Sequence, residues 1–164
     1  MEALAGEVQE SCSAAVLDGH EIVYVLRVPH RKIMSVALGI GSRLPAHCTS
    51  MGRILLASLD DEHALRLIKA AKPKALTQRT LTDPQAILDK VRQARKAGWC
   101  LVNQELEEGL ISVAAPLVNR SGRTVAALNI SGQANRTNAK TMQEQMLPAL
   151  LSAAQSISHL LQRQ

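Results

Sequence analysis

The stretch Gly41-Ser42-Arg43-Leu44-Pro45-Ala46-His47-Cys48-Thr49-Ser50-Met51-Gly52-Arg53-Ile54-Leu55-Leu56-Ala57 carries most of the information about the fold. A proline-containing loop runs into Thr49 and Ser50, either of which can cap the apolar helix that follows. The first amides of a helix lack partners and lie at the positive end of its dipole, so they favour an anion. The stretch therefore predicts a helix start that serves either as a structural cap or as a ligand site.

The composition is typical of one soluble globular domain. The 164 residues are 46% hydrophobic and 20% charged, which suits a chain with a core of its own. No apolar run approaches the ~18 residues of a membrane span, and the first ten residues do not resemble a signal peptide. We therefore expect a cytoplasmic protein. Three widely spaced cysteines, Cys12, Cys48 and Cys100, predict buried thiols and not a disulfide framework or a zinc ribbon.

The net charge of +5 raises the question of nucleic-acid binding. The basic residues are dispersed, and the chain has no Phe, one Tyr and one Trp, which argues against a base-stacking surface for single strands. A helix-turn-helix is not evident. We interpret the basic residues as solvated helix faces.

Hydrophobic periodicity and turn residues predict an α+β domain with a largely antiparallel sheet flanked by helices. A final helix contains Pro148, which should kink it or mark its restart. The predicted helices are 1–10, one after Ser50, Asp60 to about Lys72, Asp83 to Gly98, and 138–161; the predicted strands are 13–17, 21–28, 33–40, 99–102, 110–118 and 124–131.

Polar residues interrupt two of the apolar strands. Asn129 and Ser131 lie two apart, on one face of their strand, and Ser112 has a comparable place on the preceding strand. If these strands pair as a hairpin, the three side chains can line a common cavity. Alternatively, they bond to backbone or water on an ordinary sheet face.

A second segment reads Gly98-Trp99-Cys100-Leu101-Val102-Asn103-Gln104-Glu105-Leu106-Glu107-Glu108-Gly109-Leu110-Ile111-Ser112-Val113-Ala114-Ala115-Pro116. Together with the first stretch, it resembles the effector-binding domain of IclR-type bacterial transcription regulators. The shared patterns are Gly-x-x-Leu-Pro, Gly-(Lys/Arg), Gly-Trp, Glu-x-Gly-Leu and Ala-x-Pro. The resemblance implies one GAF-like domain over residues 1–164, in which residues 1–11 end a linker helix. It also implies that the N-terminal winged helix-turn-helix of the family is absent here.

The resemblance also implies where an effector would bind, namely between the sheet and the loop-helix segment. Leu44 would form an apolar wall, the amides of Ser50 and Met51 would receive a carboxylate, and Arg43 would be an adjacent candidate. The effector-binding residues implied in this way are Leu44, His47, Ser50, Met51, Val102, Leu110, Ser112, Asn129 and Ser131. The chain departs from the family pattern at Val102-Asn103, where many relatives have two acidic residues, and at Ile111, where Arg is common.

Within the family, these two segments are most similar in sequence to regulators of aromatic-acid catabolism of the protocatechuate/β-ketoadipate type. The resemblance therefore implies a ligand-sensing domain for a small aromatic or dicarboxylic acid, such as protocatechuate, 4-hydroxybenzoate or β-ketoadipate. It implies no cofactor, a homodimer or homotetramer, no membrane partner, and contact with DNA only through the N-terminal domain.

Two other function classes stay open. One is an oligomerisation module with an empty pocket. The other is a small enzyme using His47 with Cys48 or Ser50, oriented by Glu105, but neighbours in a chain rarely present nucleophile and base to each other, so we expect no catalysis. A metal site from His47, Cys48 and Cys100 has suitable ligand types without a recognisable spacing.

Overall fold

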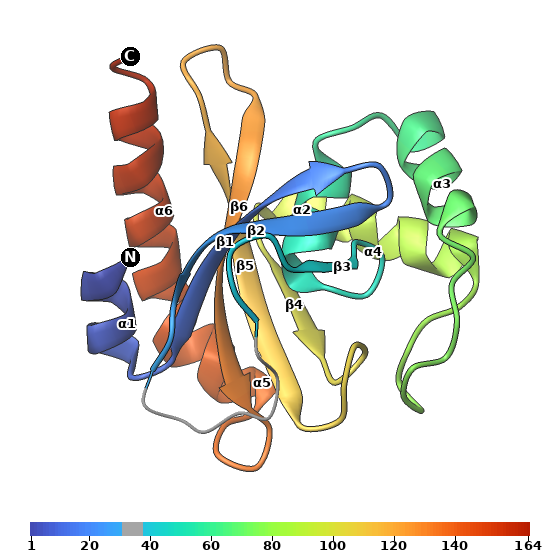
Figure 1. The fold of residues 1–164 in the computed structure, drawn as a ribbon, viewed down its shortest axis with the longest axis horizontal. Coiled ribbons are helices and arrows are strands. Elements are labelled where there is room, and N and C mark those ends of the chain that lie inside the picture. The colour runs from blue at the N-terminus through green and yellow to red at the C-terminus, as the bar shows by residue number, and fades with distance from the viewer. Residues whose placement is uncertain (31–37) are drawn as a thin grey trace.

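The computed structural model describes residues 1–30 and 38–164, and its centre is one antiparallel sheet (Figure 1). The strand order is β3-β2-β1-β6-β5-β4, and every neighbouring pair is antiparallel. The predicted α+β class with a largely antiparallel sheet is therefore confirmed. The strands are β1 Ser11–Asp18, β2 Glu21–Val28, β3 Arg43–Pro45, β4 Cys100–Asn103, β5 Leu110–Val118 and β6 Thr124–Gln133.

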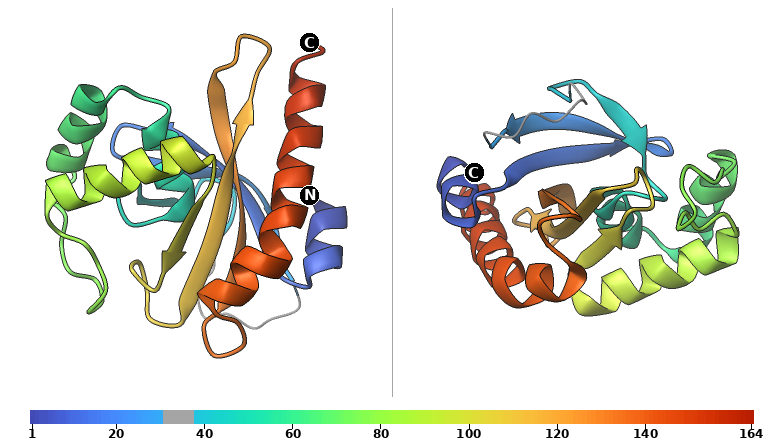
Figure 2. Two further views of the ribbon diagram at one scale, coloured as in Figure 1. Left: turned by 180° about the vertical axis from the view of Figure 1, so that it is seen from behind. Right: turned by 90° about the horizontal axis from the view of Figure 1, so that it is seen from below.

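Helices cover both faces of this sheet (Figures 1 and 2). Helices α2 (Ser50–Ala57), α3 (Asp61–Ala70) and α4 (Pro84–Ala97) share one hydrophobic cluster with β2 and β4. Helices α1 (Glu2–Val8) and α6 (Leu147–Leu161) share a second cluster on the opposite face of β5 and β6. None of the helices in the described ranges is long and apolar enough to cross a bilayer.

The pleat of β5 assigns alternate residues to these two clusters. Ile111, Val113 and Ala115 pack with α6, whereas Ala114 packs on the side of α2. On β6, Leu128 and Ile130 likewise face the α6 cluster. The polar residues Ser112 and Asn129 are thus left on the α2 side, where they are buried.

Helix α2 begins at a tight turn made by the loop before it. Thr49 is the N-cap: its Oγ1 accepts a hydrogen bond from the Gly52 amide at 3.2 Å and donates one to the Pro45 carbonyl at 2.9 Å. A Cβ at Gly52 would overlap the backbone of Ala46. The loop can therefore fold back onto the first turn of α2 only because position 52 has no side chain.

The third strand differs from the prediction. Most of the predicted strand 33–40 lies outside the described residues, and positions 38–40 are not in a strand. Instead, β3 lies inside the loop stretch and pairs with Glu21–Val23 of β2. Across this pairing the Arg43 side chain reaches Asp18 at 2.8 Å and Glu21 at 3.0 Å. Three residues are too few for a period-two pattern, so the sequence did not reveal this strand.

The other elements follow the predictions closely. The hairpin around Asp18-Gly19 is formed, with a bulge between Ala14 and Ala15. Asp60 caps α3 by accepting from the His63 amide at 2.7 Å, and Gly98 ends α4 in the left-handed conformation. The final helix is interrupted: α5 (Ala139–Thr141) leads into a π-helical turn (Met142–Met146), and α6 restarts at Leu147. Pro148 lies in the first turn of α6 and so marks a restart.

We predict that Gly52→Ala lowers the free energy of unfolding by about 2 kcal/mol or more, because the new methyl group has no space beside Ala46. Gly6→Ala is the matched control, since Gly6 also lies in a helix but its Cβ would meet nothing within 4 Å. The control should be neutral or gain up to about 1 kcal/mol from helix propensity. Urea unfolding curves measure both values. Equal effects of the two substitutions would contradict the close approach at Gly52.

Candidate functional site

A cavity of about 340 Å³, including the part open to solvent, lies between the start of α2 and the sheet. We call it the inner chamber. The residues that line it are Tyr24, Leu44, Cys48, Thr49, Ser50, Met51, Val102, Leu106, Leu110, Ser112, Asn129 and Ser131.

The polar side of the inner chamber is built by the pairing of β5 with β6. Ser112 lies opposite Ser131 in the register, and Asn129 lies opposite Ala114. The predicted hairpin is thus formed, and the structure brings Ser112, Asn129 and Ser131 to one cavity. The alternative interpretation is also partly right, because Asn129 Oδ1 accepts from the Ser13 amide at 3.0 Å and Nδ2 donates to Ser131 Oγ at 3.1 Å.

The start of α2 closes this polar side. Ser50 Oγ and Ser112 Oγ form a hydrogen bond of 2.8 Å between helix and sheet. Thr49 satisfies the Gly52 amide, and the first intrahelical bond runs from the Arg53 amide to the Thr49 carbonyl. The amides of Ser50 and Met51 have no acceptor among the described residues. Two backbone donors at the positive end of a helix thus adjoin three polar side chains.

The remaining walls of the inner chamber are apolar and include Leu44, Val102 and Leu110, which the family resemblance implied as pocket positions, and the side chain of Met51. Leu106 completes this side. An apolar wall facing a few convergent polar groups is the usual arrangement of a site that binds a small molecule with one polar end.

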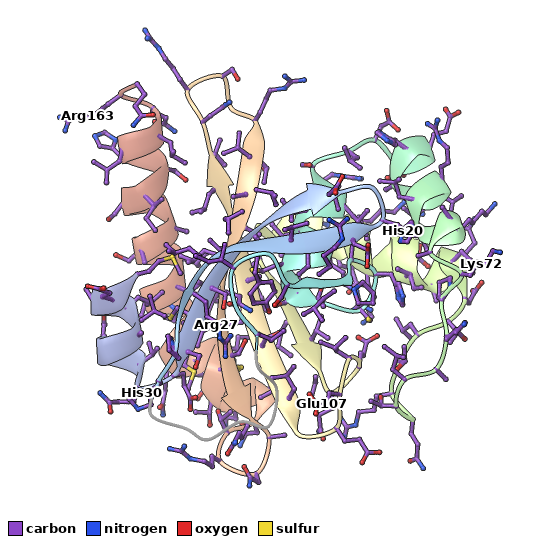
Figure 3. All side chains as sticks on the ribbon, viewed as in Figure 1. His20, Arg27, His30, Lys72, Glu107 and Arg163 are labelled. Carbon is purple, nitrogen blue, oxygen red and sulfur yellow. The ribbon has the colours of Figure 1, made fainter. Side chains whose placement is uncertain are left out.

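A second cavity adjoins the first. This outer chamber has about 520 Å³ of space, including the part open to solvent, and shares Tyr24, Leu110 and Ser131 with the inner chamber. Arg27 and Glu107 lie at its walls; in Figure 3, Arg27 is labelled on β2 and Glu107 on the loop after β4. The two chambers together offer a ligand more length than the inner chamber alone.

A buried ion pair connects the helix side of the site to the loop between β4 and β5. Arg53 Nη1 and Nη2 donate to the two carboxylate oxygens of Glu105 at 2.8 and 2.7 Å, and Arg53 Nε donates to the His47 carbonyl at 2.9 Å. The Glu105 carboxylate also accepts from the Leu81 amide at 3.2 Å. Because the side chains are only 2% and 11% exposed, this bidentate pair fixes α2 against the loop that carries Leu106 and Glu107.

His47 does not lie where the resemblance implied. Its neighbours Cys48 and Thr49 line the inner chamber, but His47 borders a separate groove with His20, Lys72 and Lys74. His20 and Lys72 are labelled together on this side of the molecule in Figure 3. The carbonyl of His47 is held by Arg53, and burial, with the nearby guanidinium, lowers the pKa of its imidazole. Arg43 is likewise outside the cavity, since it pairs with Asp18 and Glu21 at the surface.

The described residues do not form the alternative catalytic or metal sites. His47 makes no hydrogen bond to Cys48, Ser50 or Glu105 in this part of the chain, and Glu105 is engaged by Arg53. Burial raises the pKa of the Cys48 thiol to about 12, so it stays protonated and non-nucleophilic at neutral pH. Over residues 1–30 and 38–164, no three His, Cys, Asp or Glu side chains gather as metal ligands.

Sequence reasoning missed several residues of the two chambers. Tyr24 borders both, and Arg27 borders the outer one, yet both belong to a strand for which no ligand contact was predicted. The register of β2 against β1 is regular from the turn as far as Tyr24 and shifts at the bulge beyond it, so the facing of Arg27 cannot be counted from the turn. The one signal was that Tyr24 is the only tyrosine of the chain.

Comparison with known proteins identifies the family. The model of the bacterial transcriptional regulator IclR C-terminal family matches residues 1–159. The chain belongs to this family. The Pca regulon regulatory protein of Pseudomonas putida is 41% identical to this IclR-type domain over 160 residues, covering 97% of the domain and 55% of the relative. The p-hydroxybenzoate hydroxylase transcriptional activator of Acinetobacter baylyi is 37% identical over 162 residues, and the match covers 96% of the domain and 60% of that relative. The IclR-type domain thus spans little more than half of these relatives.

Solved structures agree with this assignment. A transcriptional regulator from Rhodococcus sp. RHA1 superimposes with a TM-score of 0.92 at 43% identity, covering 96% of the domain and 63% of that chain. The inducer-binding domain of a double mutant of the PobR transcription factor from Acinetobacter, in complex with 3-hydroxybenzoic acid, superimposes with a TM-score of 0.90 at 35% identity. That match covers 97% of the domain and 93% of the PobR chain.

We predict that Arg53→Met or Glu105→Leu alone lowers the free energy of unfolding of the IclR-type domain by about 3–5 kcal/mol, because each leaves a buried charge without its partner. The double variant should recover much of this loss, since it buries no charge. Denaturant unfolding of the four proteins gives the coupling energy. Arg92→Met is the control, because its pair with Asp61 is exposed and should matter little. Additive single effects would show that the pair is not coupled.

We also predict that stability falls as pH rises above about 9. Burial raises the pKa of Cys48 from 9.0 to about 12, so above pH 9 the unfolded chain loses a proton that the folded chain keeps, and unfolding is favoured. Unfolding free energies at about pH 7 and pH 10 measure the loss. In Cys48→Ala the loss should be smaller, and an unchanged loss would show that this thiol does not contribute.

Proposed function

We propose that this IclR-type domain is an effector sensor that binds a small carboxylic acid in the inner chamber and thereby controls genes of aromatic-acid catabolism. The observation that carries the proposal is the convergence of the Ser50 and Met51 amides with Ser50, Ser112, Asn129 and Ser131 opposite an apolar wall. A carboxylate accepts several hydrogen bonds at once, and donors fixed by a helix and two strands are already in place. His47 and Arg43 are not part of the proposed site.

The comparisons support an aromatic or dicarboxylic acid as the effector. The relatives are named for the Pca regulon and for p-hydroxybenzoate hydroxylase, and the PobR inducer-binding domain was solved with 3-hydroxybenzoic acid. Val102, Leu106 and Leu110 provide an apolar surface for a ring or a short carbon chain. We therefore propose that the ligand carboxylate points to α2 and its carbon frame to β4 and the loop after it.

We further propose that the full regulator is a cytoplasmic homodimer or homotetramer, that it contacts DNA through an N-terminal domain, and that it is not an enzyme. The relatives are named as regulatory proteins and are longer than the chain, which supports this arrangement. Effector binding would shift the balance between conformations of the assembly, provided that it binds one conformation better.

The test is a thermal-shift screen against 4-hydroxybenzoate, protocatechuate and β-ketoadipate, followed by calorimetry on each acid that raises the melting temperature. An acid present at about 100 times its dissociation constant should add about 2.7 kcal/mol of stability. Ser112→Ala should lower the affinity for that acid about five- to tenfold, because the substitution removes one hydrogen bond to the ligand and the hydrogen bond that positions Ser50 Oγ. Ser152→Ala, on the exposed surface of α6, is the matched control and should bind like the parent chain.

The outcomes separate the proposal from the oligomerisation module. Binding that Ser112→Ala weakens and Ser152→Ala leaves unchanged supports the sensor. Absence of a shift with all three acids, together with a stable oligomer in light scattering, would favour the module with an empty pocket. Binding that is indifferent to Ser112→Ala would place the ligand elsewhere.

A further inference from the structure

Arg27 lies at the wall of the outer chamber and has no ion-pair partner among residues 1–30 and 38–164. Arg27 Nη1 donates to Ser13 Oγ at 3.2 Å, and among the described residues no carboxylate lies within ion-pair distance of its guanidinium. Arg53, by contrast, has both terminal nitrogens on Glu105. Arg27 is only partly exposed, so its charge is less well hydrated than a surface arginine. A guanidinium of this kind, at the wall of a cavity, is suited to an anion.

Tyr24 adds a second polar group at the same place. Its side chain is nearly buried, at 4% exposure, and lines both chambers. The hydroxyl forms no hydrogen bond within the part of the chain that the structure describes. Burial raises the pKa of Tyr24 while the Arg27 guanidinium acts in the opposite direction, which reflects how near the two side chains lie. A protonated tyrosine can donate to a ligand oxygen.

A row of hydrogen bonds across the sheet links Arg27 to the inner chamber. Arg27 lies opposite Ser13, and Ser13 lies opposite Asn129. The contacts run from Arg27 to Ser13, from the Ser13 amide to Asn129, and from Asn129 to Ser131. Two strand spacings, ~10 Å, therefore separate the backbone at Arg27 from that at Asn129. The long arginine side chain reduces that gap.

We infer that the outer chamber receives the second carboxylate of a dicarboxylic effector, bound by Arg27 and the Tyr24 hydroxyl. This inference rests on the proposed function, since the first carboxylate lies at the start of α2. Two acidic residues also face the chamber. Glu10 is buried and has interactions of its own, and Glu107 is exposed on the loop, where it can turn to water. Both carboxylates oppose a second anion in the chamber, and the exposed Glu107 does so less than a buried charge would because water screens it.

The test compares each dicarboxylic acid with its own monomethyl ester, using calorimetry on the purified chain. The probes are adipate and terephthalate, with 4-hydroxybenzoate as a monocarboxylate that does not depend on the outer chamber. The parent chain should bind at least one diacid about tenfold or more tightly than its ester, because a charge-assisted pair is lost in the ester. Arg27→Met should abolish this preference, and Tyr24→Phe should reduce it about threefold or more.

Two further variants test whether the preference for the diacid depends on the charges at the outer chamber. Glu107→Gln should raise the affinity for the diacid about twofold and leave the affinity for the ester unchanged, since it removes a negative charge that repels the second carboxylate. Arg123→Met, on the exposed turn at the other end of β5 and β6, removes the same charge as Arg27→Met away from the chambers and should keep the preference. Circular dichroism confirms that each variant is folded.

Each outcome has one meaning. If 4-hydroxybenzoate binds but the parent chain prefers no diacid over its ester, the inference is wrong and the proposed function stands. The same holds if Arg27→Met and Arg123→Met reduce the preference equally, or if Glu107→Gln weakens the diacid. If none of the acids binds, the proposed function fails and the inference fails with it.

Discussion

The buried pair of Arg53 and Glu105 holds the two sides of the site in one geometry. Helix α2 is the only described helix that presents its first turn to the polar face of β5 and β6, and Arg53 follows that turn directly. Through Glu105 it fixes the loop that closes the cavity, and through the His47 carbonyl it fixes the loop before the helix. The pair thus adds a buried link between three segments that the Ser50–Ser112 hydrogen bond, the Thr49 cap and the apolar cluster also hold together.

Gly52 imposes the complementary constraint. The preceding loop folds back so closely that its backbone at Ala46 occupies the space of a side chain at position 52. Thr49 can then cap the helix and bond to Pro45 at the same time. Position 52 must lack a side chain so that the loop can approach the helix, and position 53 must supply the guanidinium of the buried ion pair. These two constraints explain why glycine and arginine stand next to each other here.

Much of this structure can be predicted from the sequence because its signals are local. Asp60, the Asp83-Pro84 pair and Gly98 delimit helices by their own chemistry, and the polar residues of two apolar strands predicted a shared cavity once those strands pair. What could not be predicted depends on contacts distant in sequence. The strand at Arg43–Pro45 exists only through β2, and the bulge at Ala14/Ala15 lets Arg27, three residues after Tyr24, border the same outer chamber as Tyr24.

Along β5 and β6, successive side chains point to opposite faces of the sheet, so residues that border the inner chamber alternate with residues that pack under the helices. Ser112, Asn129 and Ser131 border the inner chamber, while Ile111, Val113 and Ile130 pack under α6 and α1. If the effector binds in the inner chamber as proposed, substitutions at the first set change the preferred ligand and leave the packing under α6 and α1 unaltered, so new specificities arise by small steps. The same separation gives an engineer a set of positions that can be varied without redesigning the apolar packing under α6.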